Sequence, residues 1–398
     1  MKSVVVVCAK RTAIGNFGGA FKDVSAVQLG TAVLKALLEE TGIQADRIDE
    51  VIIGNVCGAG MGQNVARQIA IHSGIPVSVP AYTVNKVCGS GMKSVALAAL
   101  MIASGEAEII IAGGSENMSQ IPYVSMDTRW GAKMGNRELI DLMVRDGLSD
   151  VFNNYHMGIT AENLAEKYAI SREEQDAFAA ASQNKTETAI FSGRFKDEIV
   201  PIEIPQRKGE PIVIDTDEMP RRGVTQDSLA KLRPAFKSDG SVTAANSSGI
   251  NDGAAMIMLM SEDKANELGL EILARFVNSA SAGVDPSEMG FGPVPAIAKV
   301  LQKANWKLGQ IELAELNEAF AAQSLAVLKG LELENIGKLD HSIVNVNGGA
   351  IALGHPIGAS GTRIIVSLLH EMKKRDLHKG LASLCIGGGM GIASLWER

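Results

Sequence analysis

The chain has 398 residues, 46% of them hydrophobic, which is enough for a large buried core, and its formal net charge is −7. Acidic and basic residues are mixed without a basic stripe, so we expect no nucleic-acid partner. The run from Val4 to Cys8 is too short for a signal-peptide core, and no apolar stretch approaches about 18 residues, so we expect a cytoplasmic protein without membrane contacts.

Short apolar runs alternate with longer amphipathic stretches along the chain, which predicts an α/β fold with a mostly buried sheet. In chain order we expect strands at 4–9, 50–54, 108–112, 254–260 and 381–386, and helices at 26–41 and 92–104. The segment 119–248 carries more charge and several prolines. We interpret it as an inserted, loop-rich cap that contributes to substrate binding, after which the strand at 254–260 rejoins the first half.

An internal repeat relates residues 26–118 to residues 294–391. In both copies a charged turn leads into an apolar strand that ends in Asn, at Asn55 and at Asn317. A Ser-Gly pair then opens a helix in each copy, at Ser90 and at Ser360. The repeat predicts two similar βα units related by a pseudo-twofold axis.

Cys88 follows an extended stretch and precedes the helix expected from about Met92, so it lies at a helix N-terminus. The partial positive charge there favours the thiolate, and we expect a lowered pKa and a nucleophile. Gly89 and Gly91 allow the backbone to turn sharply and approach a substrate. The alternative interpretation is a buried structural cysteine, which is the commoner role of an intracellular cysteine.

Two further segments contain residues suited to catalysis. His355 lies between Gly354 and Pro356 in a Gly-rich loop, where an imidazole can act as general base or oxyanion donor. Cys385 ends an apolar strand and precedes the run Gly387 to Gly391, whose backbone N–H groups can hold an anionic oxygen. A structural histidine and a buried strand cysteine remain the alternatives.

The distribution of cysteine and histidine predicts neither a disulfide framework nor a metal site. The four cysteines stand at positions 8, 57, 88 and 385 without a C-x-x-C pair, and the six histidines lack metal-ligand spacing. We therefore expect no metal and no permanently bound cofactor.

Four motifs in a fixed order carry a resemblance to a known family. They are Cys88-Gly89-Ser90-Gly91, Asn317-Glu318-Ala319-Phe320, Gly354-His355-Pro356 and Cys385-Ile386-Gly387-Gly388-Gly389-Met390-Gly391. With them the chain resembles the thiolases over essentially its whole length. The resemblance implies a five-layered α-β-α-β-α sandwich of two duplicated βαβαβαββ halves with an inserted loop domain. Its expected divisions are 1–118 plus 249–270 for the N-terminal half, 119–248 for the inserted domain and 271–398 for the C-terminal half.

Within that family the chain looks most like the biosynthetic acetyl-CoA acetyltransferases, because Tyr155-His156-Met157-Gly158 and the segment 246–255 also fit. The implied reaction is the reversible condensation of two acetyl-CoA to acetoacetyl-CoA and CoA, which belongs to fatty acid metabolism. CoA would then be part of substrate and product, and the implied assembly is a homotetramer with 119–136 as the contact between dimers.

The same resemblance assigns roles to individual residues. Cys88 would become acetylated, His355 would take its proton, and Cys385 would remove the α-proton of the second acetyl-CoA. Asn317 would hold a water at the enolate, and the N–H groups of Cys88 and Gly387 would hold the tetrahedral oxygen. The implied substrate-binding residues are Leu148, His156, Met157, Arg221, Ser228, Ala235, Phe236, Ser248, Gly249, Met289 and Phe320.

Several alternatives fit part of the same pattern. One is a broader-chain 3-ketoacyl-CoA thiolase of β-oxidation, and another is a non-catalytic acyl-CoA binding relative. A decarboxylating ketoacyl synthase is disfavoured, because those enzymes have histidine or asparagine where this chain has Cys385. A regulatory disulfide between Cys88 and Cys385 is a further hypothesis. The sequence leaves open the physiological direction of the reaction and the range of acyl lengths.

Overall fold

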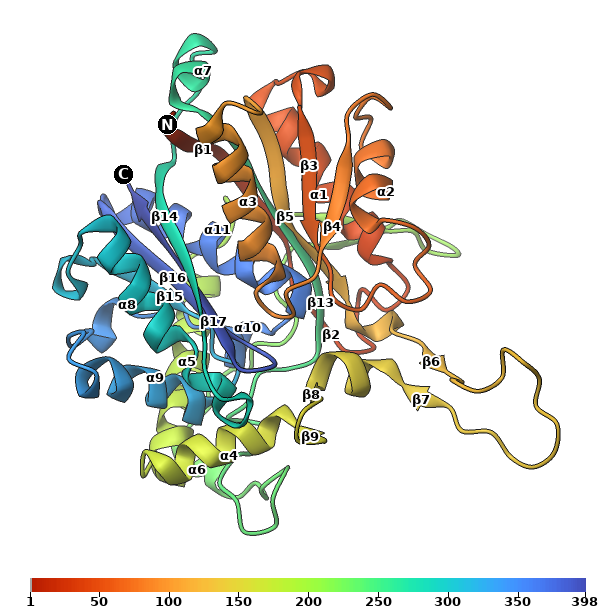
Figure 1. The fold of residues 1–398 in the computed structure, drawn as a ribbon, viewed down its shortest axis with the longest axis vertical. Coiled ribbons are helices and arrows are strands. Elements are labelled where there is room, and N and C mark those ends of the chain that lie inside the picture. The colour runs from red at the N-terminus through yellow and green to blue at the C-terminus, as the bar shows by residue number, and fades with distance from the viewer. Residues whose placement is uncertain (1) are drawn as a thin grey trace.

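The main strands form one continuous sheet in the computed structural model, which describes residues 2–398. The strand order is β15-β16-β17-β14-β1-β13-β5-β3-β4 (Figure 1). The strand bounds are β1 Val4–Thr12, β3 Glu50–Gly54, β4 Ala81–Val84, β5 Ile109–Asn117, β13 Asn251–Ser261, β14 Ala274–Gly283, β15 Leu313–Leu316, β16 Lys379–Ile386 and β17 Met390–Glu397. The two halves of the sheet meet where β1 pairs antiparallel with β14.

The strand pairing has the same pattern on both sides of that junction. In the first half β13 lies antiparallel between β1 and β5, and β3 is parallel to β5. In the second half β17 lies antiparallel between β14 and β16, and β15 is parallel to β16. An isolated parallel β-bridge joins Val344 to Ala314 in β15, as β4 pairs in parallel with β3 in the first half. The predicted duplication is confirmed, as is the return of the strand at 254–260 to the first half.

Helices form three layers around the two halves of the sheet. Helices α3 (Ser90–Ser104) and α11 (Ile357–Arg375) form the middle layer, where their apolar residues pack against both halves. Helices α1 (Ala26–Thr41) and α2 (Val65–His72) cover the outer face of the first half. Helices α8 (Pro293–Ala304) and α9 (Ala321–Leu333) cover the outer face of the second. The expected α-β-α-β-α sandwich is therefore confirmed (Figure 1).

The middle layer overturns one expectation about hydropathy. The segment Val87–Ser104 is an 18-residue stretch of mean hydropathy 1.5, long and apolar enough to cross a membrane by composition alone. Our expectation that no such stretch exists was wrong. The helix packs between two sheet halves, and a helix covered on both sides is apolar on most of its circumference.

The segment between the repeats contains more helix than a loop-rich cap would. Its helices are α4 (Met157–Lys167), α5 (Arg172–Phe191) and α6 (Gln226–Ala230). Its short strands are β6 Tyr123–Val124, β7 Ile140–Asp141, β8 Ser149–Asp150, β9 Tyr155–His156, β10 Ile199–Val200, β11 Ile202–Ile204 and β12 Ile212–Ile214. Strands β6 and β7 form the base of an arm that extends away from the body (Figure 1). The exact domain divisions at 118, 248 and 270 stay predictions.

The remaining elements are short connections. They are β2 Gly15–Asn16, α7 Glu262–Glu267 and α10 Ala350–Leu353, together with short 3₁₀ helices at Ala45–Arg47, Met118–Gln120, Pro286–Phe291, Leu308–Gln310 and His341–Ile343 and a π-helix at Met143–Leu148.

Candidate active site

The turn that carries Cys88 joins β4 to α3 and is strained. Val87 adopts φ 46°, a left-handed conformation that a β-branched residue rarely takes and that costs about 1–3 kcal/mol. The Val87 N–H donates to Asn85 Oδ1 at 3.0 Å, and the Ser90 hydroxyl donates to the Val87 carbonyl at 2.6 Å. Ser90 Oγ also accepts from the Lys86 N–H at 2.8 Å. These bonds hold the turn that presents the thiol, and α3 begins at Ser90, two residues before the predicted start.

The expected lowering of the Cys88 pKa was wrong in direction. Withdrawal of the sulfur from solvent raises the pKa of Cys88 to about 11, although the N–H groups of Gly387 and Cys88 itself act to lower it. The charge of Glu116 raises it further. Desolvation therefore outweighs these two N–H groups, and the resting thiol needs a base to become a nucleophile.

His355 is held by two hydrogen bonds at the entrance to α11. Its backbone N–H donates to Asn251 Oδ1 at 2.9 Å, and its ring Nδ1 lies 2.7 Å from Ser360 Oγ. The Ser360 hydroxyl donates to the Pro356 carbonyl at 2.9 Å, which leaves its oxygen free to accept from Nδ1–H. That arrangement leaves a lone pair on Nε2, and rotation of the hydroxyl would stabilise the other tautomer. Ser360 can thus stabilise either tautomer of His355, one that accepts a hydrogen bond at Nε2 and one that donates from Nε2.

The imidazole of His355 is neutral at physiological pH. Burial, reinforced by the charge of Arg363, lowers the pKa of His355 to about 4. Its Nε2 atom is buried and has no hydrogen-bond partner among residues 2–398. A neutral imidazole with a free lone pair beside a protonated thiol is suited to accept the thiol proton.

Cys385 lies near the end of β16, and Gly387 lies in the turn between β16 and β17. Gly388 and Gly389 adopt φ 84° and 82°, the positive angles that a tight hairpin turn needs. Cys385 is 1% exposed, and burial raises its pKa strongly, with a further contribution from the nearby Cys88. Cys385 is therefore a second protonated thiol in the resting protein, contributed by the opposite half from Cys88.

These four residues line one cavity of about 340 Å³. Cys88, His355, Cys385 and Gly387 share it with nine of the residues expected to bind substrate. The nine are Leu148, His156, Met157, Ala235, Phe236, Ser248, Gly249, Met289 and Phe320. Both halves of the duplicated fold and the inserted segment therefore contribute to its wall.

Aromatic rings form one side of the cavity. His156 stacks on Phe236 with ring centroids 4.6 Å apart, and Phe236 meets Phe320 edge to face at 6.1 Å. Gly158 leaves room for this stack, because a Cβ there would lie 2.3 Å from the Phe236 ring. His156 Nδ1 accepts from the Gly158 N–H at 3.0 Å, and burial lowers the pKa of His156. This side of the wall is thus aromatic and largely apolar, which suits an acyl or pantetheine group.

Three of the expected site residues do not line this cavity. Arg221 is exposed and lines a neighbouring hollow of about 400 Å³, which shares Gly249 with the cavity. Ser228 is exposed in α6, where its hydroxyl donates to the Thr225 carbonyl at 2.6 Å. Asn317 is 1% exposed, and both polar atoms of its side chain lack a partner among the residues that the structure describes.

The cavity wall also contains residues that the sequence reasoning did not select. They are Val87, Met118, Gly147, Ala244, Ser247, Ile250, Ala319 and Ile357. Ser247 and Ile250 lie inside the segment 246–255, and Ala319 lies inside the motif 317–320, so the sequence contained a signal for these three residues. Met118 and Ile357 belong to one buried apolar cluster that lines part of the wall. They are far apart in the sequence, so no local pattern indicates this contact.

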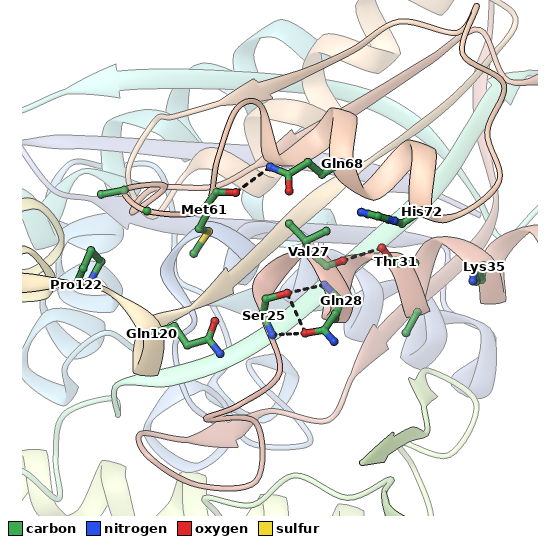
Figure 2. Close-up of a pocket in the computed structure, with 13 residues that line it drawn as sticks. Ser25, Val27, Gln28, Thr31, Lys35, Met61, Gln68, His72, Gln120 and Pro122 are labelled. Atoms are coloured by element: carbon green, nitrogen blue, oxygen red, sulfur yellow. Dashed lines mark hydrogen bonds between the residues drawn. The ribbon is translucent and has the colours of Figure 1, made fainter. Parts of the chain in front are cut away.

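A larger hollow lies elsewhere, between α1, α2 and the loop after β3 (Figure 2). Its volume is about 940 Å³. The polar side chains there are engaged locally, since Ser25 and Gln28 bond to each other and Gln68 bonds to the Met61 carbonyl at 2.9 Å (Figure 2). Its wall contains no cysteine within the described part of the chain, so the reactive groups are concentrated in the smaller cavity.

The chain is similar to known proteins over almost its whole length. The thiolase N-terminal domain family matches residues 4–263, and the thiolase C-terminal domain family matches residues 270–398. An acetyl-CoA acetyltransferase of Pseudomonas aeruginosa is 61% identical over 393 residues, covering 99% of this chain and 98% of that protein.

Two solved structures share the whole fold. An acetyl-CoA acetyltransferase from Syntrophomonas wolfei is 44% identical with a TM-score of 0.98, and each chain is covered completely. Human mitochondrial 3-ketoacyl-CoA thiolase is 43% identical with a TM-score of 0.95, covering 100% of this chain and 99% of that one.

Proposed function

Because this chain belongs to the thiolase family, we propose that it condenses two acetyl-CoA molecules to acetoacetyl-CoA and CoA, and catalyses the reverse thiolysis. It is an acyltransferase. The observation that carries the proposal is the meeting of Cys88, His355 and Cys385 in one cavity. Their protonation states, two thiols and one neutral imidazole, match what a two-stage acyl transfer needs at its start.

In the first stage His355 Nε2 takes the Cys88 proton while the sulfur attacks the acetyl carbonyl. The negative charge moves to the carbonyl oxygen, which accepts from the N–H groups of Cys88 and Gly387. Those same N–H groups already act on the Cys88 sulfur. The carbon–sulfur bond to CoA then breaks, His355 returns the proton to the leaving thiolate, and acetyl-Cys88 remains.

In the second stage Cys385 gives its thiol proton to His355 Nε2, and the resulting thiolate removes an α-proton from a second acetyl-CoA. The enolate carbon attacks acetyl-Cys88, the bond between the acetyl carbon and the Cys88 sulfur breaks, and the Cys88 thiolate recovers its proton from His355. The enolate oxygen needs donors, which His355 in its Nε2–H form and a water held by Asn317 would supply. Support comes from the buried, unpartnered amide of Asn317, since buried polar atoms generally require a partner. CoA is thus part of the substrate and the product, and no resident cofactor is needed.

Mass measurement after incubation with acetyl-CoA tests both stages. Wild-type protein should gain one acetyl group on Cys88, and Cys88→Ala should gain none. Cys385→Ala should still be acetylated but should form acetoacetyl-CoA at a rate lower by roughly three orders of magnitude. Acetylation of Cys88→Ala, or no adduct on wild-type protein as a non-catalytic binding protein would give, refutes the proposal.

Acyl length distinguishes the proposed activity from a broader-chain 3-ketoacyl-CoA thiolase. The wall includes the bulky side chains of Met157, Met289 and Phe320, which occupy space that a longer acyl chain would need. Thiolysis of 3-ketoacyl-CoA substrates of increasing length should show the highest kcat/KM for acetoacetyl-CoA. A maximum at a longer chain would identify the β-oxidation activity instead.

We also propose a homotetramer in which the arm between β6 and β7 joins two dimers. Large apolar side chains are exposed along it, with Trp130 89% and Met134 92% exposed. Exposed apolar surface of this kind marks a contact site. Light scattering of Trp130→Glu should report dimers where wild-type protein gives tetramers, and a wild-type dimer would contradict the proposal.

A further inference from the structure

Glu116 lies at the end of β5 with 0% exposure, beneath the segments that carry Cys88 and His355. Its Oε1 accepts from Asn55 Nδ2 at 3.0 Å and from the Cys57 N–H at 3.1 Å. Its Oε2 accepts from the Val56 N–H and from the Gly358 N–H, both at 2.9 Å. Each oxygen therefore receives two neutral donors, and only a carboxylate can accept all four.

One of these donors belongs to the opposite half of the molecule. Gly358 stands in the first turn of α11, three residues after His355. The packing there is tight, because a Cβ on Gly358 would lie 2.4 Å from Glu116 Oε2 and one on Gly114 would lie 2.0 Å from the Gly358 carbonyl oxygen. Glu116 thus fastens the start of α11 to the first half at the point where the two halves bring their reactive groups together.

A charge at this position costs stability. Burial raises the pKa of Glu116 to about 7, and the charge of Asp252 acts in the same direction. The Glu116 charge also raises the pKa of Cys88 and of Cys57. A neutral side chain would avoid this cost, so a function other than stability is the better explanation for a carboxylate whose donors are all neutral. The N-terminus of α11 favours the negative charge there.

We propose that Glu116 is a positioning residue for acyl transfer: by joining the first turn of α11 to the loop after β3, it sets where His355 lies relative to Cys88. The inference rests on the proposed function, because it concerns proton transfer between those two groups. Misplacing a base by about 1 Å can lower a rate about 100-fold.

Two substitutions of similar size separate the contributions of the two oxygens. Glu116→Gln keeps one oxygen and so retains two of the four bonds, and we expect kcat to fall roughly tenfold. Glu116→Met keeps neither, and we expect a fall of roughly 100-fold. KM for acetyl-CoA should change less than twofold, because Glu116 does not line the cavity. The rate of acetyl-Cys88 formation should fall in the same order.

A matched control is Glu198→Gln, which alters another buried carboxylate. Glu198 accepts from Arg11 Nε at 2.7 Å and from Ser367 Oγ at 3.2 Å, farther along α11. It should lose stability with kcat unchanged. The inference is wrong if the Glu116 variants keep the wild-type kcat. It is also wrong if Glu198→Gln loses as much kcat as a Glu116 variant with the same loss of melting temperature, because Glu116 then serves folding alone. If wild-type protein forms no acetyl-Cys88, the proposed function has failed instead.

The pH profile gives a readout that a purely structural role would not change. The titratable groups that face Glu116 are Asp252 from β13, Cys57 after β3 and Cys88 before α3. Protonating Glu116 places an O–H against two N–H donors, so wild-type kcat should fall as pH drops through about 7. Glu116→Gln should lack this step and decline only near pH 4, where His355 gains a proton. An identical step near 7 in both proteins would overturn the assignment.

Discussion

Asn55 and Asn317 directly follow corresponding strands of the two halves, β3 and β15, yet their surroundings differ. Asn55 Nδ2 donates to the Ser115 carbonyl at 2.9 Å and to Glu116 Oε1 at 3.0 Å. Asn317 is as deeply buried, but its side-chain amide has no partner among residues 2–398. Leaving buried polar atoms unpaired costs about 1–3 kcal/mol. The same residue type therefore bonds its neighbours in one half and has no side-chain partner among the described residues in the other.

Two serines at the corresponding helix starts show the same division. Ser90 Oγ bonds backbone atoms of Lys86 and Val87 and so holds the turn before Cys88. Ser360 Oγ bonds the Pro356 carbonyl and the His355 ring. The duplicated scaffold thus places equivalent side chains at equivalent loops, and their neighbours determine whether they act on the backbone or on a reacting group.

The comparison predicts its largest effect at Asn317. Asn317→Ala should lower kcat for condensation about 100-fold, the size expected when one oxyanion donor is lost. The melting temperature should stay within about 2 °C of wild type, because no hydrogen bond is removed. Steady-state kinetics and thermal unfolding check the two halves of this prediction, and a stability loss without a rate loss would reverse the assignment.

Asn55→Ala should give the opposite result. Losing its bonds to Ser115 and Glu116 should reduce the free energy of unfolding by about 2 kcal/mol, within the range for a hydrogen bond to a charged group. We expect kcat to fall less than tenfold, since three donors to Glu116 remain. Urea unfolding measures the stability change. Equal rate losses in the Asn55 and Asn317 variants would break the contrast between the halves.

Ser360→Ala should lower the rate of acetyl-Cys88 formation about tenfold, equivalent to about 1.4 kcal/mol, because His355 loses the group that orients its ring. Rapid-quench mass measurement reports this rate. Ser367→Ala is the control on the same helix, since Ser367 bonds Glu198 and not the histidine. The role of Ser360 is disproved if both variants acylate at the same rate.

Ser90→Ala should have the smallest effect. Removing its bonds relaxes the turn at Val87 and should lower the free energy of unfolding by about 1 kcal/mol. The rate of acylation should stay within about threefold of wild type. Denaturant titration measures the first quantity, and a rate loss larger than that of Ser360→Ala would contradict the comparison.

Much of the fold could be predicted because its signals are local. The helix at 26–41 has the predicted bounds, since Ser25 and Gln28 form a capping box and Gly42 ends it with φ 66°. The start of α11 was missed, because the helix begins at Ile357, directly after Pro356 and three residues before the Ser-Gly pair. Strand β5 extends past its expected end because Gly113 and Gly114 pair with β13, a partner distant in sequence.

The sequence by itself determined the duplication, because the spacing of strands and motifs repeats between residues 26–118 and 294–391. The resemblance to the thiolases supplied the layer order and the roles of Cys88, His355 and Cys385, and those roles stay predictions. The tertiary structure alone decided the protonation of Cys88, where desolvation exceeds the influence of the N–H groups of Gly387 and Cys88. It also decided the contacts of His355 with Asn251, 104 positions away, and of Glu116 with Gly358, 242 positions away. Burial and long-range hydrogen bonds arise only when distant segments pack together, so no local pattern reports them.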